Sequence, residues 1–140
     1  MIDHLDLETD QHLDAVHLLS TYRPVVLFVY DATDPFGALA FLKFNKAWAM
    51  VRPNEKPFYV VDTGKSKVLY RRVHHRHGAL DHTIQVLVIH CGRCVYMRCE
   101  EDIVAAYIRE AVEACTAAAG VAATAQEVLT PTRIPVEYTY

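Results

Sequence analysis

The sequence predicts an α/β domain in which a mixed sheet of about four strands is flanked by helices. One observation is an apolar run at 24–30, followed by a long helical pattern at 35–51 and a second apolar run at 57–62. A strand, a helix and a strand in this order indicate a parallel pair with a right-handed crossover. The other observation is a hairpin pattern over 83–99, which precedes an apolar helical stripe. A parallel half and an antiparallel half together make a mixed sheet.

Length and composition are those of one domain, spanning 1–140. The chain has 140 residues, and its 52% hydrophobic content is enough for a core. A net charge of −3 gives no global field that would draw the protein to nucleic acid or to a membrane. No apolar run approaches the roughly 20 residues that span a bilayer, and the acidic N-terminus argues against a targeting peptide. Four cysteines in a well-cored chain do not indicate a disulfide scaffold, so we expect an intracellular protein.

A short helix is expected within an N-terminal extension, residues 1–21. Asp10 is placed to cap it, because aspartate is favoured at the N-cap. We expect this helix to cover a sheet edge or one end of the core. Its inward side would carry Leu13, Val16, His17 and Ser20.

The long central helix is expected to start at the Asp34-Pro35 step. Aspartate is a favoured N-cap, and proline is preorganised for the first helical turn. Apolar residues then recur at helical spacing, so we expect most of this helix to be buried against the sheet. They are Leu39, Phe41, Leu42, Phe44, Trp48 and Val51.

The segment from 64 to 78 has two interpretations. It is a short helix with Val68, Leu69 and Val73 on one side, or it is partly open. It contains no acidic residue and has a run of basic ones. These predict a surface that faces RNA phosphates or an acidic partner, although a merely solvated face is the alternative. The basic residues are Lys65, Lys67, Arg71, Arg72 and Arg76.

The last helix is expected to follow the hairpin directly. Acidic residues at 100–102 would lie at its N-terminus, where the helix dipole favours them. Arg109 and Glu113 are one turn apart and can form an ion pair. Gly120 is the expected stop. The tail, 121–140, contains two prolines and is expected to be irregular and to pack back on the domain.

This order, a βαβ half followed by a ββα half, is the thioredoxin-like plan. In that fold the loop before the central helix carries the redox centre, which needs a low-pKa cysteine at the helix N-terminus and a second thiol nearby. The loop at 31–38 reads D-A-T-D-P-F-G-A and contains no cysteine. His82 stands where the oxidoreductases keep a cis-proline. The sequence therefore predicts no dithiol chemistry at the usual site, no catalytic residue and no cofactor.

Short motifs along the whole chain carry a resemblance to a known family. They are His4-Leu5, Arg23, the Val25–Val26 strand, the Asp34-Pro35 step, the Val61-Asp62 strand end, Asp81 and the ending Tyr138-Thr139-Tyr140. In their order and spacing the chain resembles the Dim-type spliceosomal proteins, the fifteen-kilodalton thioredoxin-like component of the U5 snRNP.

The departures from that family identify the chain as a divergent member. Family members usually carry a cysteine shortly after the Asp-Pro step, where this chain has Gly37. They usually have Pro-Cys after the aspartate that precedes the hairpin, where this chain has His82-Thr83. The segment between Asp62 and Asp81 is a few residues longer than usual.

The resemblance implies a non-catalytic, nuclear pre-mRNA splicing factor of the U5 snRNP and the U4/U6·U5 tri-snRNP. Large scaffold proteins would hold it close to small nuclear RNA or pre-mRNA until the spliceosome is activated, and it would be monomeric by itself. It would act by protein–protein contacts. The expected contact residues are Asp31, Asp34, Pro35, Phe36, Tyr138 and Tyr140, together with the basic stretch.

Two alternatives remain open. Cys91-Gly-Arg-Cys94 could serve a thiol oxidoreductase, or half of a metal site with His90 alongside. However, it falls on a hairpin turn, and four ligands at zinc spacing are not visible. The histidines of H-H-R-H at 74–77 match no regular ligand spacing, so no metal site is expected. The other alternative is a thioredoxin-like adaptor outside splicing, because fold does not dictate function.

Overall fold

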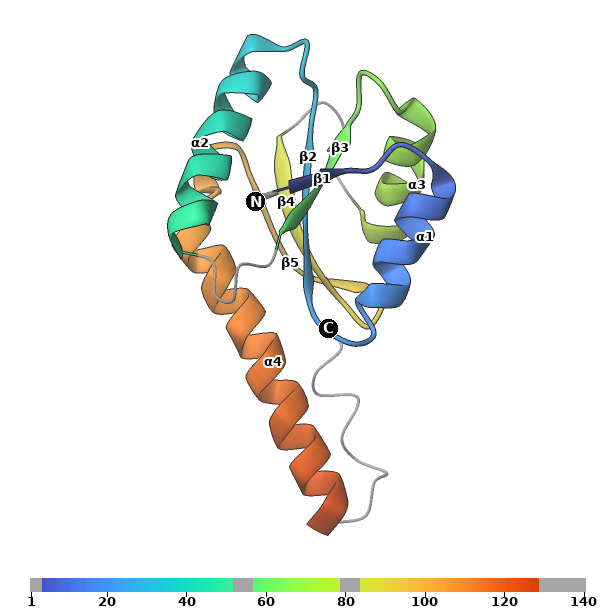
Figure 1. Ribbon diagram of the computed structural model, residues 1–140, viewed down its shortest axis with the longest axis vertical. Helices are drawn as coiled ribbons and strands as arrows, with labels where there is room; N and C mark the ends of the chain where they lie inside the picture. Colours follow the sequence, from blue (N-terminus) through green and yellow to red (C-terminus); the bar gives the residue numbers. More distant parts are fainter. Residues whose placement is uncertain (1–3, 52–56, 79–83, 129–140) are drawn as a thin grey trace.

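The computed structural model describes residues 4–51, 57–78 and 84–128, with side chains as far as residue 116. The described residues form ten elements, whose arrangement is shown in Figure 1. They are β1 (His4–Asp6), α1 (Asp10–Leu19), β2 (Val25–Tyr30), α2 (Pro35–Val51), β3 (Phe58–Asp62), α3 (Lys67–His77), β4 (Gln85–His90), β5 (Arg93–Cys99), the 3₁₀ turn η2 (Glu100–Asp102) and α4 (Ala105–Val128).

The sheet has five strands in the order β1-β3-β2-β4-β5. β1, β3 and β2 run parallel, whereas β4 is antiparallel to β2 and β5 is antiparallel to β4. The predicted mixed sheet and the parallel β2–β3 pair are therefore confirmed. The fifth strand, β1, was not predicted because three residues are too short to show a periodic pattern.

Helices cover both faces of the sheet (Figure 1). Alternate side chains of β2 point to opposite faces, and all are buried as far as Val29. Val25, Leu27 and Val29 pack with α1 and α3, whereas Val26 and Phe28 pack with α2 and α4. A strand that is covered on both faces explains the continuous apolar run in the sequence.

The start of α2 follows the prediction, but its burial does not. The Asp34 carboxylate accepts a hydrogen bond from the Phe36 amide at 3.1 Å, so Asp34 caps the helix and Pro35 opens it. Phe44 and Trp48 are buried. Leu39 and Leu42, however, are 55% and 62% exposed, so the prediction of a mostly buried helix was wrong. This helix is apolar on most of its circumference, and only one stripe of it can face the sheet.

α1 has a different cap and a different position from those predicted. Thr9, not Asp10, is the N-cap residue: its hydroxyl accepts from the His12 amide at 3.2 Å. Asp10 lies in the first turn. α1 lies beside α3 on one face of the sheet, not at an edge or an end (Figure 1). The predicted inward residues, Leu13, Val16, His17 and Ser20, are all buried.

The segment with two interpretations is the helix α3. Leu69 and Val73 are buried on its inner side, as predicted. Val68 is 59% exposed, so its predicted place on the same side was wrong. Adjacent helical residues point about 100° apart, so Val68 and Leu69 cannot both face the sheet squarely.

The C-terminal part differs most from expectation. The acidic residues at 100–102 form η2, and α4 begins only at Ala105. α4 then continues through Gly120 to Val128 and extends beyond the sheet (Figure 1). The predicted stop at Gly120 and the irregular structure over 121–128 were wrong, because one glycine costs only about 1 kcal/mol in a helix whose neighbours are mostly alanine. Residues 129–140, with Tyr138 and Tyr140, lie outside the described residues, as do 79–83.

Candidate functional site

The loop between β2 and α2 lies at the carboxyl ends of the parallel strands, where α/β sheets commonly bind ligands. Asp34 is held at the head of α2 by two further bonds: its amide donates to the Asp31 carbonyl at 3.1 Å, and its carbonyl accepts from the Ala38 amide at 2.9 Å. Together with the cap bond, these contacts fix the path of the chain from β2 into the helix. Asp31, Asp34, Pro35 and Phe36, predicted as contact residues, thus belong to one compact turn.

Gly37 lies under this turn, with no room for a side chain. A β-carbon at Gly37 would lie 2.6 Å from the Asp31 carbonyl oxygen and 3.5 Å from the ring of Tyr30. A contact of 2.6 Å is too short for a real β-carbon, so any side chain here would force the loop and the helix apart. Position 37 therefore has no room for a cysteine side chain.

Two aspartates hold the loop from opposite sides. Asp31 Oδ1 accepts from the amide of Thr33 at 2.9 Å and from its hydroxyl at 2.6 Å, and these bonds lower the pKa of Asp31. Asp62 Oδ1 accepts from the amides of Ala32 at 3.1 Å and Gly64 at 3.0 Å. The sequence alone allows two roles for Asp62, a buried acid near the usual redox site or a strand-end cap. These bonds show that it is a strand-end cap that ties β3 to the loop.

The two carboxylates converge at Gly64. A β-carbon there would lie 2.8 Å from Asp31 Oδ1 and 3.3 Å from Asp62 Oδ1. Burial, followed by the charges of Asp62 and Asp6, raises the pKa of the nearby Tyr30. Among the described residues, no group of three or more His, Cys, Asp or Glu side chains is arranged to hold a metal ion. The two carboxylates thus organise the loop and form no recognised metal site with described neighbours.

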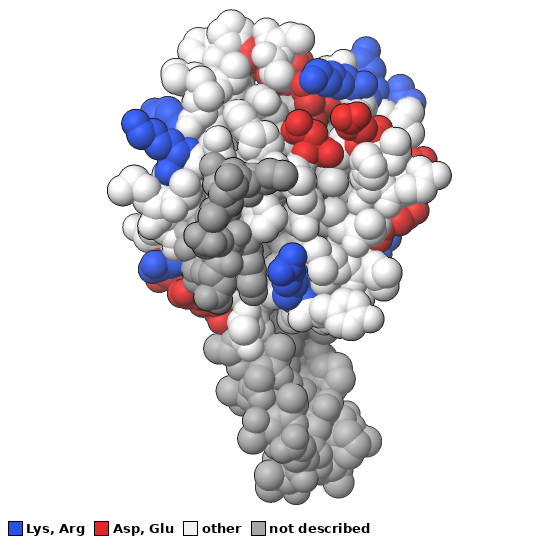
Figure 2. Space-filling view, viewed as in Figure 1, with Lys and Arg blue, Asp and Glu red and all other residues white. Residues whose placement is uncertain are grey.

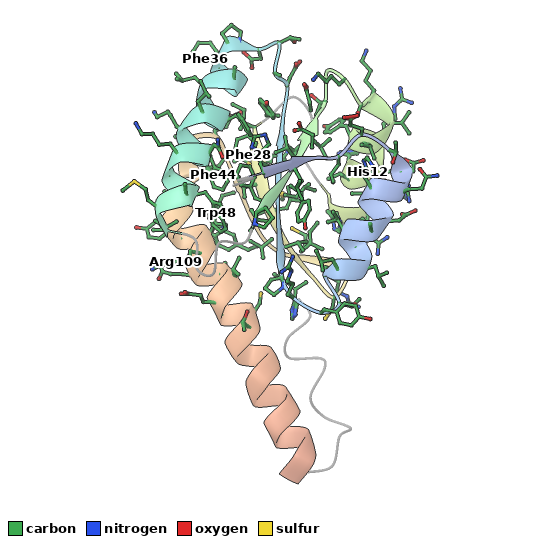
Figure 3. The ribbon with its side chains drawn as sticks, in the orientation of Figure 1. His12, Phe28, Phe36, Phe44, Trp48 and Arg109 are labelled. Carbon is green, nitrogen blue, oxygen red and sulfur yellow. The ribbon has the colours of Figure 1, made fainter. Side chains whose placement is uncertain are left out.

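An apolar groove of about 620 Å³ lies beside this loop, between α2 and the segment that joins β5 to α4. Phe36 and Leu39 line it from α2, and Val104 lines it from the other side. Phe36 is 78% exposed at the loop end of α2, whereas Phe44 and Trp48 lie farther along the helix next to the sheet (Figure 3). Lys43, Glu100 and Glu101 supply charges at the rim. An exposed aromatic ring beside an apolar groove is suited to binding a partner.

Cys91 and Cys94 lie at the other end of the sheet. Val25, at the start of β2, pairs with Ile89, so the β4–β5 turn is opposite to the β2–α2 loop. Cys91 and Gly92 both have positive φ, at 55° and 76°, as a two-residue type I′ hairpin requires. Their amides donate to the carbonyl and the hydroxyl of Ser20, at 2.8 and 2.9 Å, which docks the turn on the end of α1.

All four cysteines are free thiols. Cys91 is exposed, and the other three are half-buried. Burial raises the pKa of Cys94, and its thiol donates to the Tyr96 carbonyl at 3.4 Å. Burial is also the main cause that raises the pKa of Cys99 and of Cys115. A reactive thiol needs a lowered pKa, so these half-buried thiols are poor nucleophiles.

The predicted basic surface maps to α3 and to the turn before it. Arg72 bridges to α1, with Nη1 3.2 Å from Asp10 and Nη2 3.1 Å from Asp14. Arg72 is thus occupied by acidic partners within the protein. Lys65, Lys67, Arg71 and Arg76 are exposed. On the face shown in Figure 2, acidic and basic side chains are interspersed and form no broad area of one sign.

The structure brings together only some of the contact residues that the sequence predicted. The loop residues form one site, whereas α3 packs with α1 on the opposite face of the sheet from the groove. Sequence reasoning missed the groove formed by Leu39 and Val104. It left the role of Asp62 open, and Gly64, two residues after this strand-end aspartate, is a local signal of the cap.

The sequence matches no known family model, and no curated protein is measurably similar to it. Solved structures do resemble it. A proposed oxidoreductase with a thioredoxin fold superposes with a TM-score of 0.67 at 17% identity, over 78% of this chain and 93% of that one. A reduced Schistosoma mansoni thioredoxin gives 0.59 at 14% identity, over 79% and 96%. The long form of spinach chloroplast thioredoxin f gives 0.57 at 16%, over 80% and 85%.

These superpositions agree with the fold described above, in which helices cover both faces of a mixed sheet. Identities this low show the fold and carry no activity over to the chain. Among the described residues, no helix is both long and apolar enough to cross a membrane. The predicted fold class is thus confirmed: the chain has a thioredoxin-like fold.

Proposed function

We propose that this chain is a non-catalytic binding protein that uses the β2–α2 loop and the adjoining apolar groove to hold a partner. The observation that supports it best is Gly37, where a side chain would come within 2.6 Å of the Asp31 carbonyl. Three residues before Gly37, Asp34 caps the helix by accepting a hydrogen bond from the Phe36 amide. A thiol pair at the usual place in the fold would need a cysteine at both positions; neither holds one, and Gly37 has no room for one.

The groove supports a binding role in place of catalysis. Phe36 offers a large ring that is 78% exposed, and Leu39 adds a second apolar side chain that is 55% exposed. Exposed aromatic and aliphatic groups beside a concave apolar surface are typical anchors of protein–protein contacts. Glu100 and Glu101 on one rim and Lys43 on the other give such a contact a defined polarity.

At the finer level, we propose that the partner belongs to the splicing machinery. The support is the resemblance to the Dim-type proteins, which extends from His4-Leu5 to the Tyr138-Thr139-Tyr140 ending. The partners would be scaffold proteins of the U5 snRNP and the tri-snRNP in the nucleus. The mechanism would be occupancy, in which a rigid domain fills a site until it is displaced.

Affinity purification of the tagged protein from its own cells tests both the binding role of the groove and the splicing identity of the partner. Phe36→Ala/Leu39→Ala removes two exposed groove side chains, and Leu42→Ala/Met50→Ala removes two exposed side chains of α2 that do not line the groove. We expect partner recovery to fall about tenfold or more with the first pair and to stay near wild type with the second.

The RNA that co-purifies distinguishes a splicing role from a binding role outside splicing. Enrichment of U4, U5 and U6 RNAs with U5 scaffold proteins would support the splicing role. A groove-dependent partner without any small nuclear RNA would contradict splicing and leave the binding role standing. Disulfide reductase turnover that disappears in Cys94→Ser would contradict the non-catalytic proposal as a whole.

A further inference from the structure

A second concave surface lies on the opposite face of the sheet, between α1 and α3. It has a volume of about 570 Å³, which is within the range of small-molecule sites. Leu13 lines it from α1 and Val68 lines it from α3, and these side chains supply an apolar portion. The rest of the lining is mainly cationic, with Arg71, Arg72 and Arg76 from α3. This groove shares no lining residue with the one beside α2.

The three arginines of this groove differ in how their charges are compensated. Arg72 is paired with both Asp10 and Asp14. Arg71 and Arg76 make no ion pair with another described residue. Three guanidinium groups and two carboxylates give this group a net charge of +1, and both carboxylates are paired with Arg72. A guanidinium offers a planar fork of donors that matches phosphate oxygens.

Arg76 packs against the neighbouring β4–β5 hairpin. Its Nη2 lies 3.2 Å from the point where a β-carbon of Gly92 would stand, so the guanidinium occupies the space beside this glycine. The positive charge of Arg76 also affects the two histidines at this end of the groove, His17 and His77. Burial first, and Arg76 second, lower the pKa values of His17 and His77 to about 4. This end of the groove therefore has a positive field and neutral imidazoles at neutral pH.

We propose that the α1–α3 groove binds a nucleotide, with its phosphates on Arg71 and Arg76 and its flat apolar portion against the exposed side chain of Val68. Charge alone would suit any phosphate, but the apolar lining adds contact area for a ring. The exposed His75, which also lines the groove, offers an imidazole face beside it. The proposal does not depend on the proposed function, because the two grooves lie on opposite faces of the sheet.

Calorimetric titration of the full chain with ADP, adenosine and pyrophosphate tests the proposal. At low ionic strength we expect ADP to bind about tenfold or more tightly than either adenosine or pyrophosphate, because each of these lacks one half of the contacts. Raising the salt concentration should weaken ADP binding, since part of the energy is electrostatic. Equal affinities for pyrophosphate and ADP would overturn the nucleotide assignment, and so would the absence of saturable ADP binding at about 1 mM.

A charge-matched pair of variants tests the residues. Arg71→Ser/Arg76→Ser removes two exposed cations from the groove, and Lys46→Ser/Arg98→Ser removes two exposed cations that line neither groove, one on α2 and one on β5. We expect the first pair to lose about tenfold or more in ADP affinity and the second to stay within about twofold of wild type. Unchanged circular dichroism would show that both pairs fold. Equal ADP affinity in the two pairs would overturn the proposal.

A short single-stranded RNA distinguishes a nucleotide site from an RNA-binding surface. If the groove takes a nucleotide, ADP should compete with any RNA that requires Arg71 and Arg76. RNA binding that is lost in Arg71→Ser/Arg76→Ser but is not displaced by ADP would overturn the proposal in favour of an extended RNA contact.

Discussion

At the residue scale, Gly37 limits which side chains the β2–α2 turn can accept. Glycine within a helix normally costs about 1 kcal/mol relative to alanine, so Gly37→Ala would stabilise an unconstrained helix. Here the added β-carbon would meet the Asp31 carbonyl at 2.6 Å. We expect Gly37→Ala to destabilise the protein by about 1–3 kcal/mol in urea denaturation.

A cysteine at the same position should behave in the same way. Gly37→Cys should be destabilised like Gly37→Ala and should not create a reactive thiol. A stable Gly37→Cys variant with fast thiol labelling would show that the loop can reorganise to accept a side chain, and it would remove the main support for a non-catalytic role.

The pair of His17 and His77 makes stability depend on pH. Their Nε2 atoms are 2.8 Å apart, so one ring donates and the other accepts, and the accepting ring must be neutral. Their pKa values fall from 6.5 to about 4, with burial as the main cause. Between these values the unfolded chain binds more protons than the folded one, so stability decreases as the pH falls.

Thermal unfolding between pH 7.5 and pH 4 checks this expectation. The melting temperature should fall through the window from about 6.5 to about 4. His77→Gln should flatten the profile, because it removes one of the two titrating rings. His75→Gln replaces an exposed histidine of the same helix and should leave the slope unchanged.

At the element scale, Ser20 joins α1 to the β4–β5 hairpin. Its buried hydroxyl donates to the His17 carbonyl at 2.6 Å and accepts from the Gly92 amide at 2.9 Å. Ser20→Ala would leave the Gly92 amide without this partner. We expect a loss of about 1–3 kcal/mol in the free energy of unfolding.

Thr21→Ala is the matched control for Ser20→Ala. Thr21 is the next residue, and its exposed hydroxyl donates to the Leu18 carbonyl within its own helix end, at 2.6 Å. Its removal should cost less than about 0.5 kcal/mol. Equal losses in the two variants would show that the hydroxyl of Ser20 does not couple the helix to the hairpin.

The elements that sequence reasoning predicted well are those with a strong local signal. The apolar run of β2 and the cap of α2 at Asp34 depend on residues close together in the chain. The elements and contacts that it missed depend on tertiary structure. β1 exists because it pairs with β3. The Asp62 bond to Ala32 spans 30 residues, and the His17–His77 pair spans 60. No local pattern contains such information, so the candidate site was predicted only as far as its loop.

At the scale of the whole molecule, the thiols should differ sharply in accessibility. Cys91 is exposed on the hairpin turn, whereas the other three cysteines are half-buried and have raised pKa values. Under native conditions we expect a thiol reagent to label one site fast and the other three slowly. Cys91→Ser should remove the fast phase. A fast phase that persists in this variant would show that one of the half-buried thiols is more accessible than the structure indicates.

The two edges of the sheet differ in how they limit association. On one edge, β1 is three residues long, so it offers few free backbone groups. On the other edge, β5 carries an irregular register opposite Val88 and Ile89, and it presents the exposed side chains of Arg93 and Arg98. Short strands, bulges and charged residues are the features by which β proteins discourage unwanted strand addition. The sheet is therefore a poor template for amyloid-like growth, even though both of its faces are built from strongly β-forming segments.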